Sequence, residues 1–386
     1  RYLTVLGKYE PALDAASDAI AQAERAGAQS LIAQALHRRG VILQLMGRYT
    51  DAEVALAQAA QQLTADAAAQ ASIAHARGNI RYYLGDFEAA RQMIGEAQQL
   101  FTAANDRQGV IRCLFVVGQI DWRRGQFAQA RRHFGEALEM CHAIGWRNYE
   151  GFLLGALGDS AFDMGDYRTA QQSHEQALWL CRELGDREGE ALSLDVLGLL
   201  ALVRGDYLLS QAHCSAALAI QREIGDRRGA GYSLNYLGHV HAATEGFPAA
   251  RQAFEESLAL RIELGAEQAA IDSLAGRALV LWQSGDRHGA TDDATRVLEW
   301  IETRGVDGIE LPVQVLLICH TIFSGLAAHD AAWSVQAARA LSLGKEMIER
   351  RAAEIQDADL RQHFLRDGFG NAQLLGLWAE QAARHA

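Results

Sequence analysis

The sequence predicts an all-α fold, in which antiparallel helix pairs stack side by side into a solenoid. Three observations lead to this fold class. A unit of about 40 residues recurs along the chain, with Gly, Asp and an aromatic residue at fixed positions. Apolar residues make up 49% of the chain, and only three residues are proline. A single unit of this kind cannot bury its apolar face, so the units need one another to form a core.

The clearest copy of the unit lies in residues 184–247. Leu-Gly-Asp-Arg at 184–187 returns as Ile-Gly-Asp-Arg at 224–227, and a Gly-Asp-Tyr turn at 205–207 lies between them. We set the register on the loop glycine that precedes an aromatic residue, which places successive slots at a nearly constant spacing. These loop slots are Gly7, Gly47, Gly85, Gly125, Gly165, Gly205, Glu245 and Gly285.

A second small residue lies seven positions before each loop slot from the second unit onward. Two helices can approach closely only where side chains are small, so we expect these positions to mark helix crossings. They are Gly40, Gly78, Gly118, Gly158, Gly198, Gly238 and Ala278. We expect the loop glycine to end the first helix in the left-handed conformation, and the Asp that often follows it to cap the second helix.

The repeat pattern ends near residue 304. We therefore expect an array of about eight units over residues 1–304, with the first unit truncated. Residues 305–386 are expected to form a degenerate helix pair and C-terminal capping helices. The apolar patterning of this tail predicts helices over 311–328, 331–353, 357–365 and 371–383.

The small residue, the Gly-Asp-Tyr turn and the Ala-Leu pairs at 177–178 and 217–218 resemble the tetratricopeptide repeat (TPR). The resemblance covers residues 1–304 and implies a right-handed superhelical solenoid. The unit here is longer than the usual 34-residue repeat. This longer form resembles the arrays of kinesin light chains, polarity adaptors and bacterial multidomain regulators.

A second resemblance lies in the tail. Residues 350–365, followed by Asn371 and Leu374–Trp378, are similar to the C-terminal end of bacterial STAND-type regulatory ATPases such as the maltose-regulon activator. The chain begins at Arg1 with neither an initiator Met nor a signal peptide, so we interpret it as part of a larger protein. The resemblance implies a non-catalytic sensor module of a bacterial signal-transduction ATPase or transcriptional regulator. The alternative is a free-standing adaptor that binds an extended partner peptide.

Composition narrows the function classes further. With 36 basic and 48 acidic residues the formal charge is −12, which argues against a nucleic-acid surface. No apolar run is long enough to span a membrane. The five scattered cysteines form no Cys-x-x-Cys pair, and we expect reduced core thiols in a cytoplasmic protein. Two of them, Cys141 and Cys181, occupy the same slot of neighbouring units.

No catalytic or metal-binding pattern stands out. Gly344-Lys345 lacks the upstream glycine of a phosphate-binding loop, and His239 and His241 point apart on a helix. Asp159 and Asp163 are four residues apart and share a helix face, but groove or solvent carboxylates are favoured over an acid–base pair. We expect no enzyme activity, no cofactor and no metal.

The TPR resemblance implies that the first helices line a concave groove. Counted from the small residue, positions −6, −3, +1 and +4 form its stripe, and aromatic residues concentrate in the middle units. We expect a protein or peptide partner, or a small effector, to bind there. For Trp122 and Phe162 the alternative is packing against a neighbouring helix. The predicted groove residues are His75, Asn79, Tyr82, Arg112, Phe115, Gln119, Trp122, Phe152, Asp159, Phe162, Asp195, Tyr232, Asn235 and His239.

Overall fold

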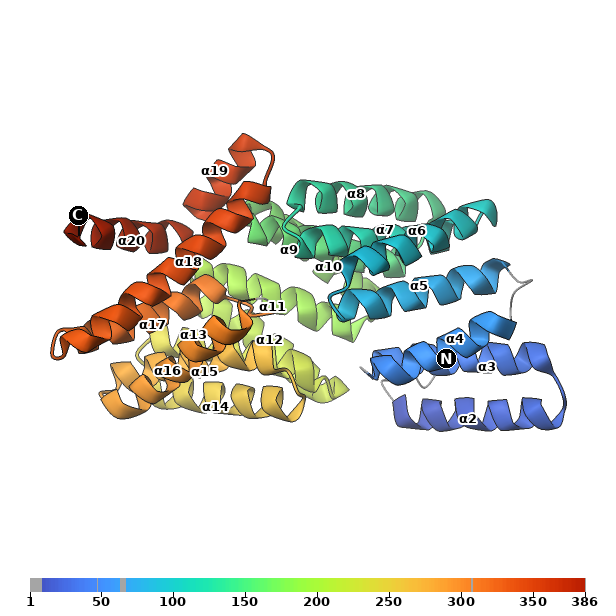
Figure 1. Cartoon of the computed structure of the whole chain (residues 1–386), viewed down its shortest axis with the longest axis horizontal. Coiled ribbons are helices and arrows are strands. Elements are labelled where there is room, and N and C mark those ends of the chain that lie inside the picture. The colour runs from blue at the N-terminus through green and yellow to red at the C-terminus, as the bar shows by residue number, and fades with distance from the viewer. Residues whose placement is uncertain (1–8, 47, 63–66, 307, 386) are drawn as a thin grey trace. The chain divides into compact units, whose positions relative to one another are not determined.

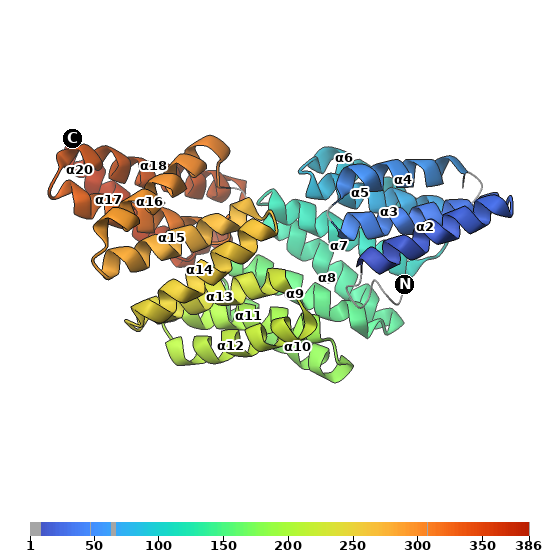
Figure 2. The ribbon, with the colours of Figure 1, turned by 90° about the horizontal axis from the view of Figure 1, so that it is seen from below.

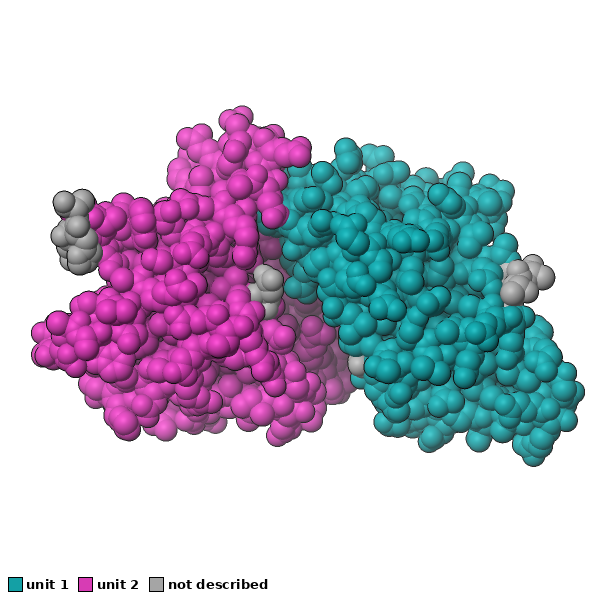
Figure 3. Space-filling model, in the orientation of Figure 1, with its two compact units in different colours: residues 1–146 teal, residues 147–386 magenta. Residues whose placement is uncertain are grey.

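The structure is a computed structural model that describes residues 9–46, 48–62, 67–306 and 308–385. Within these ranges it is helical with no β-strand, which confirms the predicted fold class. The chain divides into two compact units, residues 1–146 and 147–386, shown in teal and magenta in Figure 3. They are called unit 1 and unit 2 below. An array boundary near residue 304 stays a prediction.

Unit 1 contains seven described helices, and each packs against the next (Figure 1). First helices of repeats are α3, α5 and α7, and their antiparallel second helices are α4, α6 and α8. The bounds are α2 Tyr9–Arg25, α3 Gln29–Leu45, α4 Tyr49–Gln62, α5 Ala67–Tyr83, α6 Phe87–Ala103, α7 Arg107–Arg123 and α8 Phe127–Ile144.

Unit 2 continues the pattern from α9 to α16, and Figure 2 shows these helices following one another in chain order. Four more helices and a short 3-10 turn follow in the described part of unit 2. The repeat helices are α9 Arg147–Asp163, α10 Tyr167–Leu184, α11 Arg187–Val203, α12 Tyr207–Ile224, α13 Arg227–Ala243, α14 Phe247–Glu263, α15 Glu267–Gln283 and α16 Arg287–Arg304. The tail elements are α17 Pro312–Ala327, η1 Ala331–Trp333, α18 Ser334–Glu354, α19 Ala358–Asp367 and α20 Asn371–His385. The tail helices agree with the sequence prediction to within three residues.

The turns have the caps that the sequence predicts. Gly85, Gly165 and Gly205 have φ between 76° and 80°, and Glu245 adopts a φ of 60° where the repeat lacks glycine. The side chain of Asp86 accepts a hydrogen bond from the backbone amide three residues ahead. Asp106, Asp166, Asp186, Asp206, Asp226 and Asp286 make the same cap. The slots at Gly7 and Gly47 lie outside the described residues.

The small residues do mark helix crossings. A Cβ atom added to Gly118 would lie 2.5 Å from the ring of Phe134, and one added to Gly238 would lie 2.7 Å from the ring of Phe254. In each case the obstructing side chain lies on the second helix of the same pair. The crossing is therefore close enough to exclude even a methyl group.

An ion pair recurs at the opposite end of three consecutive helix pairs, α9–α10, α11–α12 and α13–α14. The Arg that opens the first helix contacts a Glu near the end of the second, as in Arg147–Glu183 at 2.7 Å and Arg187–Glu223 at 2.8 Å. Arg227 and Glu263 repeat it. These pairs are exposed, so each contributes at most about 1 kcal/mol. They account for the Arg in the Leu-Gly-Asp-Arg turn.

The end of the chain returns to the start of unit 2. After α18, helices α19 and α20 fold back so that Nε2 of His363 donates to the backbone oxygen of Gly165 at 3.1 Å. Phe369, between the two helices, packs against a core cluster that includes Leu199 and Leu234. The tail is thus part of the core of unit 2.

Gly198→Leu should destabilise the chain by about 1–3 kcal/mol, because a side chain there collides with Cys214 Sγ. Circular-dichroism melting measures the effect. Gly376→Leu is the matched control, since no atom lies within 4 Å of a Cβ added at this helical position. Equal melting temperatures for Gly198→Leu and the wild type would refute the assigned crossing.

Leu197→Asp should cost at least about 3 kcal/mol, because Leu197 is only 7% exposed and the new carboxylate would be buried without a partner. Leu208→Asp, at a leucine that is 83% exposed, should melt within a few degrees of the wild type. An equal loss of stability in both variants would contradict the burial of Leu197 as the cause of its effect.

Candidate functional site

The predicted groove residues divide between the two units. His75, Asn79, Tyr82, Arg112, Phe115, Gln119 and Trp122 lie in unit 1, and Phe152, Asp159, Phe162, Asp195, Tyr232, Asn235 and His239 lie in unit 2. For both sets, ligand binding stays a prediction.

In unit 1 the stripe is mostly engaged in contacts within the chain. Burial lowers the pKa of His75 to about 4, and its Nδ1 lies 3.3 Å from Nδ2 of Asn79. The hydroxyl of Tyr82, which is 6% exposed, accepts a hydrogen bond from Arg123. The guanidinium of Arg112 lies over the ring of Phe101. Phe115 and Trp122 are half-buried, and the Phe115 ring packs 5.8 Å from that of Phe134.

In unit 2 the stripe has an open part on α9 and α11. Phe152 is 48% exposed and Leu192, at the same slot one repeat later, is 51% exposed. Asp159 is half-exposed, with Oδ1 3.2 Å from Nε2 of the buried His174. The Phe162 ring, also half-buried, packs 5.4 Å from that of Tyr167. Solvent therefore reaches two apolar side chains and a carboxylate on neighbouring first helices.

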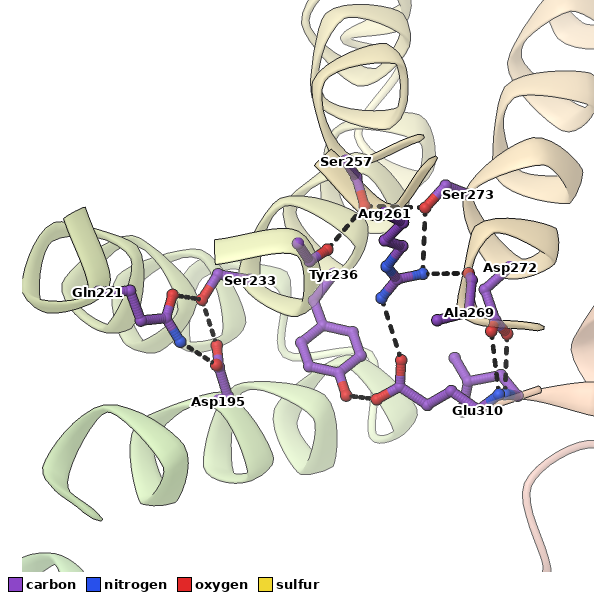
Figure 4. A network of polar contacts seen from close by, with 12 residues as sticks. Asp195, Gln221, Ser233, Tyr236, Ser257, Arg261, Ala269, Asp272, Ser273 and Glu310 are labelled. Atoms are coloured by element: carbon purple, nitrogen blue, oxygen red, sulfur yellow. Dashed lines mark hydrogen bonds and ion pairs between the residues drawn. The ribbon is translucent and has the colours of Figure 1, made fainter. Parts of the chain in front are cut away.

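Further along unit 2 the stripe is closed. Asp195 on α11 is 4% exposed, and its Oδ2 accepts a hydrogen bond from Gln221 at 2.5 Å. The Ser233 hydroxyl lies within hydrogen-bond distance of both Asp195 Oδ1 and Gln221 Oε1 (Figure 4). One hydroxyl proton cannot serve two acceptors. A protonated Asp195 resolves this, since it can donate to Ser233, which then donates to Gln221.

The pKa of Asp195 agrees with a protonated carboxyl group. Burial raises the pKa of Asp195 to about 7, opposed by the hydrogen bonds from Ser233 and Gln221. Asn235, the next stripe residue at this slot, is fully buried, and neither atom of its amide has a hydrogen-bond partner among the described residues. These two predicted groove residues are therefore inside the protein.

The chain itself covers this part of the stripe. Glu310, in the connection between α16 and α17, accepts a hydrogen bond from the Tyr236 hydroxyl, and its Oε2 lies 3.5 Å from Arg261 Nη2. The carboxylate of Asp272 accepts the backbone amides of Glu310 and Leu311, both at 2.9 Å. Figure 4 shows Glu310 between Tyr236 and Arg261. Burial raises the pKa of Glu310 well above its usual value, and Asp195 adds to the shift.

The two remaining predicted groove residues of unit 2, Tyr232 and His239, also contact other side chains. The Arg261 guanidinium lies 4.9 Å from the centre of the half-buried Tyr232 ring. His239 packs edge-on against Phe254 at 5.0 Å, and burial lowers its pKa to about 4. A neutral imidazole in an apolar contact is a packing group rather than a charged one.

The sequence prediction missed Gln221, Arg261 and Glu310. One signal was available, because Gln221 and Arg261 occupy the slot that Cys141 and Cys181 hold in earlier units. A polar residue at a buried apolar slot indicates a buried polar network. Glu310 carries no such signal, since it lies outside the repeat.

The described part of the chain has neither a metal-binding cluster nor a helix that could span a membrane. No group of three or more His, Cys, Asp and Glu side chains there is placed to hold a metal ion. None of the described helices is long and apolar enough to cross a membrane.

Comparison with known families agrees with this architecture. Residues 69–142 and 197–263 match the tetratricopeptide repeat family. These two stretches are tetratricopeptide repeats, and the chain has the architecture of a TPR array. These matches cover parts of both units, and the repeat register extends the TPR pattern to the repeats between them. No curated protein sequence matches the chain significantly.

Several solved structures have the same fold. A Rap protein in complex with the competence and sporulation factor aligns with a TM-score of 0.64 and 15% identity, over 89% of this chain and 99% of that one. A Rap conjugation gene regulator in complex with a Phr peptide aligns at 0.58 and 16%, over 72% and 76%. A STAND protein with a TPR sensor from Pyrococcus horikoshii aligns at 0.57 and 14%, over 93% and 55%. At these identities the likeness shows the fold, and the TPR array resembles such sensor regions.

Asp195→Asn should change how stability depends on pH. The folded pKa of about 7 exceeds the unfolded value near 4, so the folded state holds an extra proton between these pH values. Stability from this group is therefore present below about pH 4 and is lost as pH rises to 7. An amide mimics the protonated acid, so the variant should gain on the order of a few kcal/mol over the wild type at pH 8. At pH 4 it should gain little. If the melting temperatures of the variant and the wild type differ by the same amount at pH 4 and pH 8, Asp195 does not carry a buried proton.

Proposed function

We propose that this TPR array is a non-catalytic recognition module that binds an extended peptide segment of a partner protein on the open part of unit 2. The observation that carries the proposal is the pair of exposed apolar side chains, Phe152 at 48% and Leu192 at 51%. They occupy the same slot on adjacent first helices, α9 and α11. Exposed apolar neighbours on an otherwise packed face are typical of a binding surface.

The spacing of the two side chains suits an extended chain. Neighbouring packed helices are about 8–10 Å apart, and an extended chain rises about 3.3 Å per residue. Two side chains about three residues apart along a partner peptide could therefore contact Phe152 and Leu192. Asp159 and Asp163 on α9 are half-exposed carboxylates, and they favour a peptide that also carries a basic residue.

The solved relatives support a peptide as the partner. One Rap structure contains the competence and sporulation factor, and another contains a Phr peptide. Two alternatives for the protein to which this array belongs each have a similar solved structure. The STAND protein, of which the alignment spans 55%, favours a sensor within a larger signal-transduction ATPase or regulator. The Rap protein, which is covered over 99% of its length, favours a free-standing adaptor.

The coding sequence upstream of Arg1 distinguishes these contexts. A nucleotide-binding domain in the same reading frame favours the sensor of a regulatory ATPase, and its absence favours the adaptor. In the first context, a ligand acts by binding one state of the parent protein more tightly than the other.

Selection of a random peptide library on the full chain, followed by fluorescence polarisation with the enriched peptides, tests the binding face. We expect enrichment of peptides with apolar residues about three positions apart and a basic residue nearby. The double variant Phe152→Ser, Leu192→Ser should weaken their binding by at least about tenfold, because each anchor contributes about 1–2 kcal/mol.

Leu208→Ser is the matched control, since Leu208 is 83% exposed but lies on the second helix α12. It should bind the selected peptides as tightly as the wild type. Peptides that bind the double variant with unchanged affinity would place recognition elsewhere, and a library without enriched peptides would argue against peptide recognition.

A further inference from the structure

Unit 2 has a surface pocket of about 630 Å³ that is separate from Phe152 and Leu192. Three distant parts of the chain form its walls, namely residues 165–168, 203–204 and 363–373. The contact between His363 and Gly165 holds the walls together. The backbone around Gly368 packs directly on Gly165, where an added Cβ would lie 2.9 Å from the Gly368 nitrogen. The pocket therefore exists only because the tail returns to the α9–α10 turn.

Arginines from all three walls line the pocket: Arg168, Arg204 and Arg366. Arg366 is paired with Asp367 at 2.6 Å. Arg204 donates only to neutral groups, the Gln171 side chain and the Tyr167 backbone oxygen. Arg168 makes no hydrogen bond or ion pair with any residue that the structure describes. Arg168 and Arg204 therefore share this pocket without an ion pair to either of its carboxylates, Asp166 and Asp367.

Another repeat places opposite charges at the positions that Arg168 and Arg204 occupy. In unit 1, Glu88 in the first turn of α6 pairs at 2.6 Å with Arg124 at the end of α7. Arg168 and Arg204 hold the same two register positions on α10 and α11. The chain has an arginine where the equivalent pair has its glutamate. Like charges at paired positions repel, and a bound anion would offset that repulsion.

We propose that this pocket binds the phosphate group of a small phosphorylated molecule, with Arg168 and Arg204 as its anion-binding residues. A phosphate monoester carries a charge of about −1.5 to −2 at neutral pH, which matches two unpaired guanidinium groups better than a single carboxylate does. Guanidinium groups also bind phosphate oxygens with two parallel hydrogen bonds. The volume exceeds that of phosphate alone, so an organic group can lie beside Tyr167 and Phe369, which also line the pocket.

The ligand would contact both the repeat helices and the tail. Arg204 belongs to the end of α11, whereas Arg366 and Phe369 belong to the α19–α20 region. Binding would therefore strengthen the attachment of the tail to the α9–α10 turn. This inference does not depend on peptide recognition at Phe152 and Leu192, and either one can fail alone.

Calorimetric titration of the full chain with inorganic phosphate and with pyrophosphate tests the proposal, against sodium acetate and sodium chloride at matched ionic strength. Wild type should bind phosphate and pyrophosphate more tightly than acetate. Arg168→Glu should weaken phosphate binding by at least about tenfold. Its melting temperature without phosphate should equal or exceed that of the wild type, because the new carboxylate can pair with Arg204 as Glu88 pairs with Arg124. A folded variant that no longer binds separates loss of the site from loss of the structure.

Arg124→Gln, which removes an arginine of the same register outside the pocket, is the control and should bind phosphate like the wild type. Arg204→Gln should lose affinity as Arg168→Glu does. The proposal is overturned if phosphate binds the wild type no more tightly than acetate does. Unchanged binding by Arg168→Glu, or an equal loss in Arg124→Gln, would overturn it as well.

Discussion

The close approach of two helices at a small residue, usually glycine, is the constraint on which each repeat depends. At Gly118 and Gly238 the facing aromatic ring leaves no space for a Cβ atom. The second helix must therefore lie directly against the first, and its other side chains reach the next repeat. The Asp caps and the left-handed loop residues then set where each helix begins and ends. The position of every stripe residue follows from this one contact, made again in each successive repeat.

Unit 2 combines this apolar scaffold with an internal polar network that changes along the stripe. At α9 and α11 apolar side chains face solvent, whereas at α13 and α15 the segment that carries Glu310 packs against Tyr236 and Asp272. Asp272 holds the backbone of Glu310 and Leu311 through two amides. A side-chain carboxylate that receives successive backbone amides is also how a groove can hold a peptide. The inner surface of unit 2 therefore already contains one segment held in this way.

Much of the fold could be predicted from the sequence because its causes are local. The crossing at Gly198, the cap at Asp206 and the tail helices each depend on a few neighbouring residues in a fixed register. The burial of Asp195 and Asn235 could not be predicted in full, because the 310–311 segment that packs on this part of unit 2 lies beyond the last repeat helix and outside the register. The division into two units near residue 146 could not be predicted either, because the repeat spacing is the same on both sides of it. Register predicts which face a residue occupies, but not what covers that face.

The hydrogen bond from His363 to Gly165 joins residues 198 positions apart. A stack of repeats without such a contact has two free ends, and a disturbance at one repeat fades over its nearest neighbours. In unit 2 the last helices instead contact the first helix pair, so the order of contacts forms a closed circuit. A shift of α9 relative to α11 must then be matched either by each repeat through α16 or by the joint at Gly165. Movement of any repeat in unit 2 would therefore strain the contact between His363 and Gly165. Cleavage of the tail would remove this contact and leave the repeats free to move.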